Sequence, residues 1–500
     1  MSGHVWFRGD ATALAAAIVR GEFSAGDALQ RTLAGLQDHG GAINAVSLLR
    51  ADLGFETAAR LDAELLACRD DAARAALLGA RPFFGVPLLL KDVGPASAHP
   101  QLPSRMGSRL FGAAGHVWPT MGALTARYLA AGFVPFGRST SPEMGISAST
   151  EALANGGPTR NPWHLAHSAG GSSGGAAAAT AAGLVSIAHA NDGAGSIRIP
   201  ASCCGLIGLK PSRGLMPMGP LAGEGWGGMA IDHMLTRSVR DCAVALDVSA
   251  GSDPGAPYAA PSRPSSYLLA MQEPPPPLRI ALCDSFFEGD PVHADVAAAV
   301  RGFAAQLEKL GHHVEAARPE LATLDIVRPL MHVVATGTAM TLDSIARQRG
   351  REINQDEVEP VTFGALKVGQ TLSAADYLAA LNALHQLGRK MSAFHQRYDL
   401  LLTPVLAEPP PLLGRLAMNN PDFMAYRLGP TGLWRYSPFA PLANATGAPS
   451  ISLPAGLSST GQPGLPIGAM LSAAFGEDEL LLRVAAQWEW RYAKPDPIAP

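Results

Sequence analysis

The fold is decided by the stretch SAGGSSGGAAAATAAGLVSIAHANDGAGSIRIPASCCGLIGLK, which occupies residues 168–210. Residues 174–190 are alanine-rich and apolar, and they predict a buried helix followed by a strand. Glycine and serine runs such as residues 170–175 are often flexible linkers. A linker would not lead directly into a buried helix, so we interpret this run as a structured loop.

Before this stretch, short apolar runs alternate with helical segments. Residues 86–90 and 133–136 have strand length, and residues 120–131 have the pattern of a helix. Such alternation is typical of α/β proteins with a largely buried sheet. We therefore expect one large α/β domain with a mixed, mostly parallel sheet core flanked by helices.

A proline-rich segment divides the chain. Residues 251–277 contain eight prolines and predict a surface connection. We expect one domain over residues 1–500, in which about 80–250 form the core. Residues 255–400 are expected to form a variable, mostly helical covering region, and residues 400–490 to return strands to the core sheet.

Length and composition describe an ordinary globular chain. Its 500 residues are 47% hydrophobic and 16% charged, which provides a large core and excludes disorder as the overall state. The formal net charge of −4 gives no basic excess for nucleic acid binding. The five cysteines are odd in number and lie in hydrophobic runs, which favours free thiols in a reducing cytoplasm.

Signals for targeting, membranes and metals are missing. The start, MSGHVWFRGD, lacks the features of a secretory signal, and no run reaches the ~18 apolar residues of a membrane span. Cys203-Cys204 lacks a CxxC partner for zinc. We expect a cytoplasmic protein with no metal, no cofactor, no membrane contact and no nucleic acid partner.

Two serines lie in glycine-rich surroundings. Ser172 belongs to the run of residues 170–175, and Ser196 follows Gly193-Ala194-Gly195. Glycines beside a serine allow successive backbone N–H groups to point at one spot, which a developing oxyanion requires. The pattern favours nucleophilic catalysis by a serine.

A serine nucleophile needs a base, and no histidine in the sequence is an obvious one. Lys91 follows three leucines at the end of a predicted strand and is one of only six lysines. Burial there would lower its pKa toward neutrality. A lysine at a strand end is more often ion-paired or solvated, but the two serines favour Lys91 as the base.

Three separated motifs resemble those of the amidase signature family. They are Lys91-Asp92, GGSSGG at residues 170–175 and DGAGSIRIPASCCGLIGLKP at residues 192–211. The interval of 24 residues from Ser172 to Ser196 also agrees with that family. The resemblance covers nearly the whole chain and is weakest between about 255 and 400. The last motif also resembles bacterial hydrolases of nylon-type cyclic and short oligoamides.

The resemblance implies an amidase signature domain with a Lys–Ser–Ser triad. By matching position, Ser196 is the nucleophile, Ser172 is the bridging serine after a cis peptide bond, and Lys91 is the base, neutral in the free enzyme. The oxyanion donors are the backbone N–H groups of Gly193, Ala194, Gly195 and Ser196. A loop that lines the pocket in relatives resembles Met144, Gly145 and Ile146.

Residues around the motifs have simpler expected roles. Ala194 stands where many relatives have glycine, and its methyl group should narrow the space beside the substrate carbonyl. Asp192 is expected to accept backbone hydrogen bonds. Arg198 and Lys210 are expected to order loops by ion pairing.

The expected reaction is hydrolysis of the C–N bond of a neutral, mostly apolar amide through an acyl-enzyme on Ser196, which yields a carboxylate and an amine. In some relatives the reaction extends to anilides, esters and carbamates, since the same acyl-enzyme forms whichever group leaves. The expected partner is a small-molecule amide, and both a monomer and a homodimer are compatible with the sequence.

Two other enzyme classes and a binding role compete with this hypothesis. An α/β-hydrolase-type esterase would use Ser173 in the GxSxG pattern of residues 171–175, but residues 164–168 do not look like the strand that its elbow needs. The A-type subunit of a tRNA-dependent amidotransferase would carry GSIRQP, whereas this chain has Ile199 in place of the glutamine. A non-catalytic binding protein would not need all three triad residues.

Overall fold

Two neighbouring parallel strands bring the predicted motifs to one edge of the sheet. In the computed structural model, which describes residues 6–492, β2 (Pro87–Lys91) pairs in parallel with β6 (Ile187–Asp192). Because the carboxyl ends of parallel neighbours meet at one edge, Lys91 and Asp192 lie at the same edge. Helices α6 (Gly174–Ala181) and α7 (Arg198–Cys204) begin shortly after Ser172 and Ser196.

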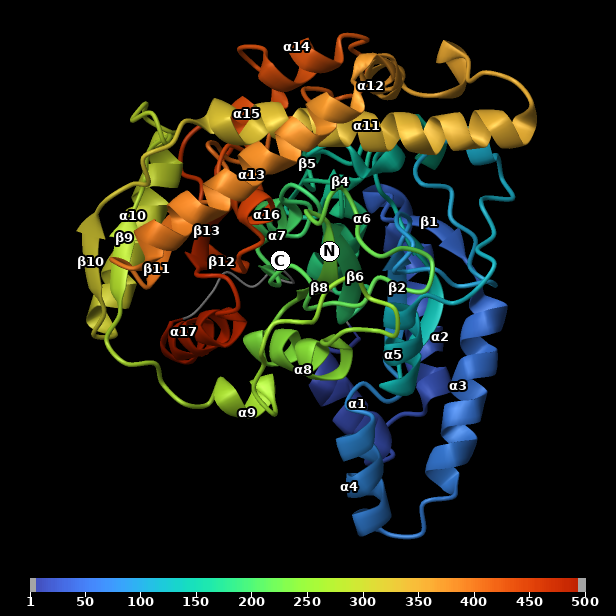
Figure 1. Cartoon of the computed structure of the whole chain (residues 1–500). Coiled ribbons are helices and arrows are strands. Elements are labelled where there is room, and N and C mark those ends of the chain that lie inside the picture. Colours follow the sequence, from blue (N-terminus) through green and yellow to red (C-terminus); the bar gives the residue numbers. More distant parts are fainter. Residues whose placement is uncertain (1–5, 493–500) are drawn as a thin grey trace.

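The sheet has eleven strands within the described residues (Figure 1). Besides β2 and β6 they are β1 (Val46–Leu49), β3 (Val134–Ser139), β7 (Ile207–Lys210), β8 (Ile231–Thr236), β9 (Arg279–Leu282), β10 (His313–Ala316), β11 (Leu400–Pro404), β12 (Ser450–Leu457) and β13 (Pro466–Ala473). Their order across the sheet is β1-β3-β2-β6-β8-β7-β12-β13-β11-β9-β10.

The strands run in mixed directions. Parallel pairs occur in two groups, β3-β2-β6 and β11-β9-β10. The other six neighbouring pairs of the main sheet are antiparallel. The expected mixed sheet is therefore confirmed, but its pairing is not mostly parallel. Short returns such as residues 458–465, which join β12 to β13, permit only antiparallel neighbours.

Helices cover both faces of the sheet. On one face α7 packs so closely that a Cβ at Gly208 of β7 or at Gly468 of β13 would lie 2.7 Å from α7 side-chain atoms. On the other face, α17 (Asp478–Arg491) packs on β12 and β13 and contacts α8 (Val239–Ser249). Figure 1 shows α8 and α17 on one side of the sheet and α11 (Thr323–Arg349), α12 (Pro360–Thr371) and α13 (Ala374–His395) on the other. The flanking helices predicted from the sequence are confirmed.

The remaining helical elements connect the strands. The α-helices are α1 (Ala11–Val19), α2 (Ala25–Ile43), α3 (Ala51–Leu66), α4 (Asp71–Ala80), α5 (Ala123–Ala130), α8 (Val239–Ser249), α9 (Tyr267–Ala270), α10 (Ala294–Lys309), α11 (Thr323–Arg349), α12 (Pro360–Thr371), α13 (Ala374–His395), α14 (Phe423–Leu428), α15 (Leu433–Tyr436), α16 (Pro441–Thr446) and α17 (Asp478–Arg491). Single-turn 3₁₀ helices are η1 (Arg109–Phe111), η2 (Glu143–Gly145), η3 (Leu153–Asn155) and η4 (Gln355–Glu357). Helices α11 to α13 lie within the predicted covering region, whose separation from the core stays a prediction.

One local prediction was wrong. Residues 164–168 do form a strand, β5 (His164–Ser168), which pairs with β4 (Arg160–Asn161) in a separate two-stranded sheet. The side-chain oxygen of Asn161 accepts from the Trp163 N–H at 3.0 Å, so a tight local turn, and not an apolar pattern, leads into the strand. Because β5 is outside the main sheet, it is not the core strand of an α/β-hydrolase elbow.

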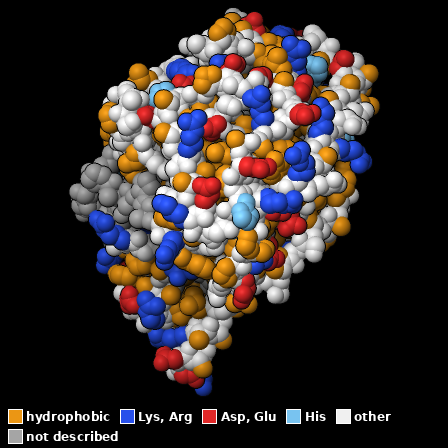
Figure 2. Space-filling model, turned by 90° about the vertical axis from the view of Figure 1, so that its left-hand side faces the viewer, with side chains coloured by type: hydrophobic (Ala, Val, Ile, Leu, Met, Phe, Trp, Pro, Cys, Tyr) orange, Lys and Arg blue, Asp and Glu red, His pale blue; other side chains and the backbone are white. Residues whose placement is uncertain are grey.

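Charges of one sign do not form a patch on the face of the molecule that Figure 2 shows. In Figure 2, Lys and Arg side chains are interspersed with Asp and Glu side chains on that face. None of the helices between residues 6 and 492 is long and apolar enough to cross a membrane.

Candidate active site

Lys91 is a fully buried lysine at the end of β2. Its Nζ lies 2.7 Å from Ser172 Oγ and 2.5 Å from Asn191 Oδ1. Burial lowers the pKa of Lys91 to about 7, although Asp232 and Asp192 act in the opposite direction. Near neutral pH a large fraction of this amine is therefore uncharged and able to accept a proton.

The backbone of Lys91 is held by both neighbouring strands. Its N–H donates to His189 Nδ1 on β6 at 3.1 Å, and its carbonyl accepts from Arg138 Nη1 on β3 at 2.9 Å. Because Nδ1 of His189 accepts, its Nε2 carries the hydrogen that faces Asp232 Oδ1 at 3.0 Å. These hydrogen bonds fix the backbone of Lys91, and its side chain extends from there to Ser172.

Ser172 lies in a tightly packed, buried glycine loop. The peptide bond between Gly171 and Ser172 is cis, which the family resemblance implies. A Cβ at Gly171 would lie 2.7 Å from the backbone nitrogen of Ser149, and one at Gly175 would lie 2.5 Å from the Ala45 carbonyl oxygen. The glycines thus permit close approach of backbone, and residues 170–175 are a structured loop, as predicted.

Asp192 organises the loop that carries Ser196. Its carboxylate accepts from the backbone N–H groups of Gly195 at 2.6 Å and Ile197 at 3.1 Å. Arg198 adds two hydrogen bonds of 3.0 Å from its guanidinium, and Asn444 adds one of 2.9 Å from its amide. The expected roles of Asp192 and Arg198 in ordering this loop agree with these contacts.

Charge in this loop is balanced inside the protein. Burial alone would raise the pKa of Asp192, but the Arg198 guanidinium and the Asn444 amide hold it well below its ordinary value. The Arg198 and Asp192 side chains are both fully buried. Asp192 is therefore an ionised anchor at working pH and not a proton donor.

The hydrogen bond from Gly195 corrects one expectation. Gly195 was expected to donate to the oxyanion, yet its N–H is already taken by Asp192, because the carboxylate lies 2.6 Å away. No hydrogen bond within residues 6–492 uses the N–H groups of Gly193, Ala194 or Ser196. Three of the four expected donors thus remain available.

The structure brings some predicted residues together more closely than others. Lys91 and Ser172 are hydrogen-bonded, whereas Ser196, which is 8% exposed, makes no side-chain hydrogen bond within the described part of the chain. Gly145, in the predicted loop of Met144, Gly145 and Ile146, lies beside Ser172, because a Cβ there would be 3.5 Å from Ser172 Oγ. Lys210, the second buried lysine among residues 6–492, donates to the Pro211 carbonyl at 2.7 Å. It makes no ion pair within these residues, so the ion pairing expected of it is wrong.

Two residues of the site were missed by sequence reasoning. Asn191 directly precedes Asp192 in the quoted motif, and that adjacency was the available signal. Trp226 packs its ring on Gly193, where a Cβ would lie 2.7 Å from the ring, and it has a left-handed φ of 51°. Nothing in the sequence connects Trp226, from the segment between β7 and β8, with Gly193.

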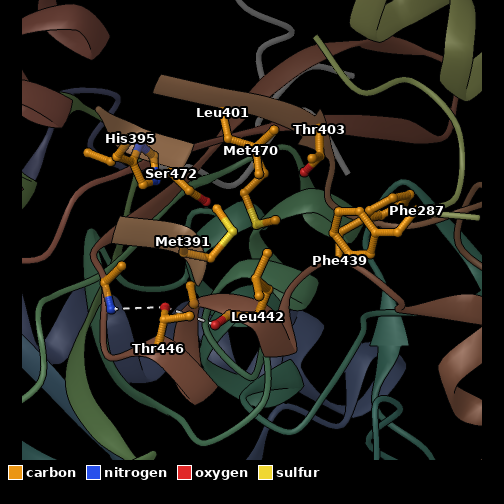
Figure 3. Close-up of a pocket in the computed structure, with 13 residues that line it drawn as sticks. Phe287, Met391, His395, Leu401, Thr403, Phe439, Leu442, Thr446, Met470 and Ser472 are labelled. Carbon is orange, nitrogen blue, oxygen red and sulfur yellow. Dashed lines mark hydrogen bonds between the residues drawn. The ribbon is translucent and has the colours of Figure 1, made fainter. Parts of the chain in front are cut away.

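The pocket in Figure 3 is not lined by Lys91, Ser172 or Ser196, and it is too small for a substrate. Its volume of about 20 Å³ is enough for roughly one water molecule. Leu442 and Thr446 of α16 line it, and Thr446 Oγ1 donates to the Leu442 carbonyl at 3.0 Å.

Within residues 6–492, no group of three or more His, Cys, Asp or Glu side chains is placed to hold a metal ion.

Comparison with known proteins identifies the family of this chain. Residues 43–482 match the protein family described as Amidase. The chain belongs to the amidase signature family. The 6-aminohexanoate-cyclic-dimer hydrolase of Pseudomonas sp. (strain NK87) is 35% identical over 98% of this chain and 97% of the relative.

Two solved structures extend the comparison. The structure of 6-aminohexanoate cyclic dimer hydrolase complexed with substrate has a TM-score of 0.85 and 33% identity, and the match covers 98% of this chain and 99% of that chain. A bacterial aryl acylamidase belonging to the amidase signature enzymes has a TM-score of 0.85 and 25% identity, over 96% of both chains. The α/β amidase signature fold is thereby confirmed.

Membership makes this protein an amidase-type hydrolase acting on C–N bonds. The α/β-hydrolase alternative is wrong, and the position of Ser173 gives the physical reason. The hydroxyl of Ser173 donates to the Asn191 carbonyl at 3.2 Å. The strand before its loop, β5, lies outside the main sheet, whereas the nucleophile of an α/β-hydrolase follows a strand of that sheet.

The buried ion pair between Asp192 and Arg198 yields a stability prediction. In Arg198→Met, the Asp192 carboxylate stays buried without its cation, so the free energy of unfolding should fall by about 3–5 kcal/mol. Arg240→Met is the matched control, because the Arg240 side chain is 49% exposed in its pair with Asp10. Its loss should stay below about 1 kcal/mol. Urea unfolding followed by circular dichroism measures both, and equal losses would contradict the role given to Arg198.

Proposed function

We propose that the protein is an amidohydrolase that cleaves the C–N bond of a neutral, mostly apolar amide through an acyl-enzyme on Ser196. The observation that carries this proposal is the contact of 2.7 Å between the buried amine of Lys91 and the Ser172 hydroxyl. A buried amine with a pKa of about 7 can accept a proton from serine at neutral pH, as an exposed ammonium cannot.

The reaction runs through the two serines in sequence. Lys91 takes the proton of Ser172 while Ser172 takes that of Ser196, and Ser196 Oγ attacks the amide carbonyl. The backbone N–H groups of Gly193, Ala194 and Ser196 hold the resulting oxyanion. The proton then returns along the same path to the leaving amine. A water molecule then loses its proton to Ser172 and Lys91 in the same way. It attacks the ester on Ser196, and the carboxylate is released.

The surroundings of the serines support a neutral substrate. Val93, Trp226 and the Met144 loop contribute uncharged groups around Ser172 and Gly193. The Asp192 carboxylate, which binds the backbone on both sides of Ser196, is already neutralised by Arg198. The names of the relatives, a cyclic-dimer amide hydrolase and an aryl acylamidase, are consistent with an uncharged amide or anilide.

A substrate panel tests the proposal. A primary amide, an anilide, an ester, a carbamate and free glutamine should be compared, the first four with a common acyl or leaving group, and Ser196→Ala serves as the blank for each. Turnover of the amide or anilide that disappears in Ser196→Ala is expected. Turnover of glutamine alone would instead favour an amidotransferase-type role, and identical behaviour of both proteins would favour a binding role.

The two serine roles make separable predictions. A fluorophosphonate should label the wild type and Ser172→Ala at Ser196, and it should not label Ser196→Ala. Ser172→Ala should lower kcat by about 10²–10⁴-fold, because the relay to Lys91 is lost. Intact-mass spectrometry detects the label. Labelling that persists in Ser196→Ala and disappears in Ser172→Ala would show that the roles are reversed.

The pH dependence follows from the lowered pKa of Lys91. Neutral Lys91 is the active form, so kcat/KM should rise about tenfold per pH unit below pH about 7 and level off above it. Initial rates measured between about pH 5.5 and about pH 9.5, on both sides of that pKa, give the profile. A profile that is flat across this range would contradict Lys91 as the base.

A further inference from the structure

Within the described part of the chain, the amine of Lys91 has three hydrogen-bond neighbours, and two of them are atoms of Asn191. Besides Ser172 Oγ, Nζ lies 2.5 Å from the side-chain oxygen of Asn191 and 3.5 Å from its backbone carbonyl. The amide nitrogen of Asn191 faces the Val93 carbonyl at 3.4 Å. Because that carbonyl can only accept, the side-chain oxygen of Asn191 is the atom that faces Lys91.

These contacts define how a neutral amine is oriented. A neutral amine has two hydrogens and one lone pair, and both oxygens of Asn191 can only accept. They therefore take the two hydrogens, which leaves the lone pair directed at the Ser172 hydroxyl. Without the side-chain oxygen, the amine would be free to turn and to donate a hydrogen to Ser172 instead.

We propose that Asn191 is a positioning residue that holds the Lys91 amine with its lone pair on the Ser172 hydroxyl. This inference rests on the proposed function, because it matters only if Lys91 takes the proton of Ser172. No hydrogen bond joins Asn191 to the nucleophile Ser196 within residues 6–492, and the proposal gives Asn191 no contact with the reacting carbonyl.

The charges around Lys91 explain why an amide suits this position. Asp232 on β8 and Asp192 on β6 both act to raise the pKa of Lys91, against its burial. Arg138 on β3 and His189 on β6 contact only the Lys91 backbone. A carboxylate at position 191 would place a further negative charge beside Nζ, whereas the neutral amide accepts the hydrogen without favouring the ammonium.

A pair of substitutions of similar size tests the proposal. Asn191→Leu removes the acceptor, so kcat should fall on the order of 10–100-fold at every pH, with KM changed by less than about threefold. Asn191→Asp keeps an acceptor but adds charge, so the acid limb of kcat/KM should move up by about one to three pH units. At alkaline pH, where Lys91 is again neutral, Asn191→Asp should recover to within about tenfold of the wild-type kcat.

The controls separate this inference from a structural role and from the proposed function. Asn419→Asp, at an exposed position outside the helices and strands, makes the same change of charge and should leave the profile unchanged. Asn191→Ala replaces the leucine variant if that does not fold, with the same expected loss of kcat. The inference is wrong if the acid limb of the kcat/KM profile of Asn191→Asp stays at the wild-type pH. It is also wrong if both variants at position 191 lose kcat equally at all pH values. In either case, turnover that depends on Ser196 would still support the proposed function. Absence of Ser196-dependent turnover in the wild type would overturn the proposed function, and the inference with it.

Discussion

The burial of one lysine amine is the constraint on which the site depends. Lys91 is placed at the sheet edge because β2 and β6 are parallel neighbours that end together. Among residues 6–492, its amine has only neutral partners at hydrogen-bond distance, Ser172 and Asn191. Burial without a paired carboxylate favours the uncharged amine. A fold that exposed Lys91, or paired it directly with an acid, would remove the proposed base.

Asp192, at the same edge of the sheet, is a buried group that keeps its charge, unlike Lys91. It is as deeply buried as Lys91, yet Arg198 and Asn444 bind its carboxylate directly, and the ionised form is retained. The neighbouring residues Asn191 and Asp192 thus have two different roles. One keeps a neutral amine oriented, and the other uses a fixed charge to shape the loop before Ser196. That difference arises from the partners of each group and not from burial.

Local pattern predicted much of this architecture. The alanine-rich run predicts a buried helix and strand, which are α6 and β6, and the glycine run proves to be a structured loop. The positions of Lys91, Ser172 and Ser196 are fixed by motifs. Sheet direction was less predictable, because apolar runs do not encode which strand returns beside which. Strand β5 was missed because a turn held by Asn161 leads into it, without an alternating apolar pattern.

Long-range contacts account for what the sequence could not provide. The loss of Gly195 as an oxyanion donor follows from the direction of the Asp192 carboxylate, which only the folded loop defines. Trp226 reaches Gly193 from a distant segment, and Asn191 meets Lys91 across 100 residues of chain. Pairings of this kind depend on tertiary geometry, for which a single sequence carries no periodic signal.

The most direct test is to titrate Lys91 itself. Only six lysines are present, so protein labelled with ¹³C at the lysine Cε carbons gives few NMR signals to follow against pH. The signal that disappears in Lys91→Met belongs to Lys91, and this separates it from Lys210, whose pKa burial also lowers to about 7. The account predicts a pKa of about 7 for Lys91. A value near the ordinary lysine pKa of about 10.4 would contradict it.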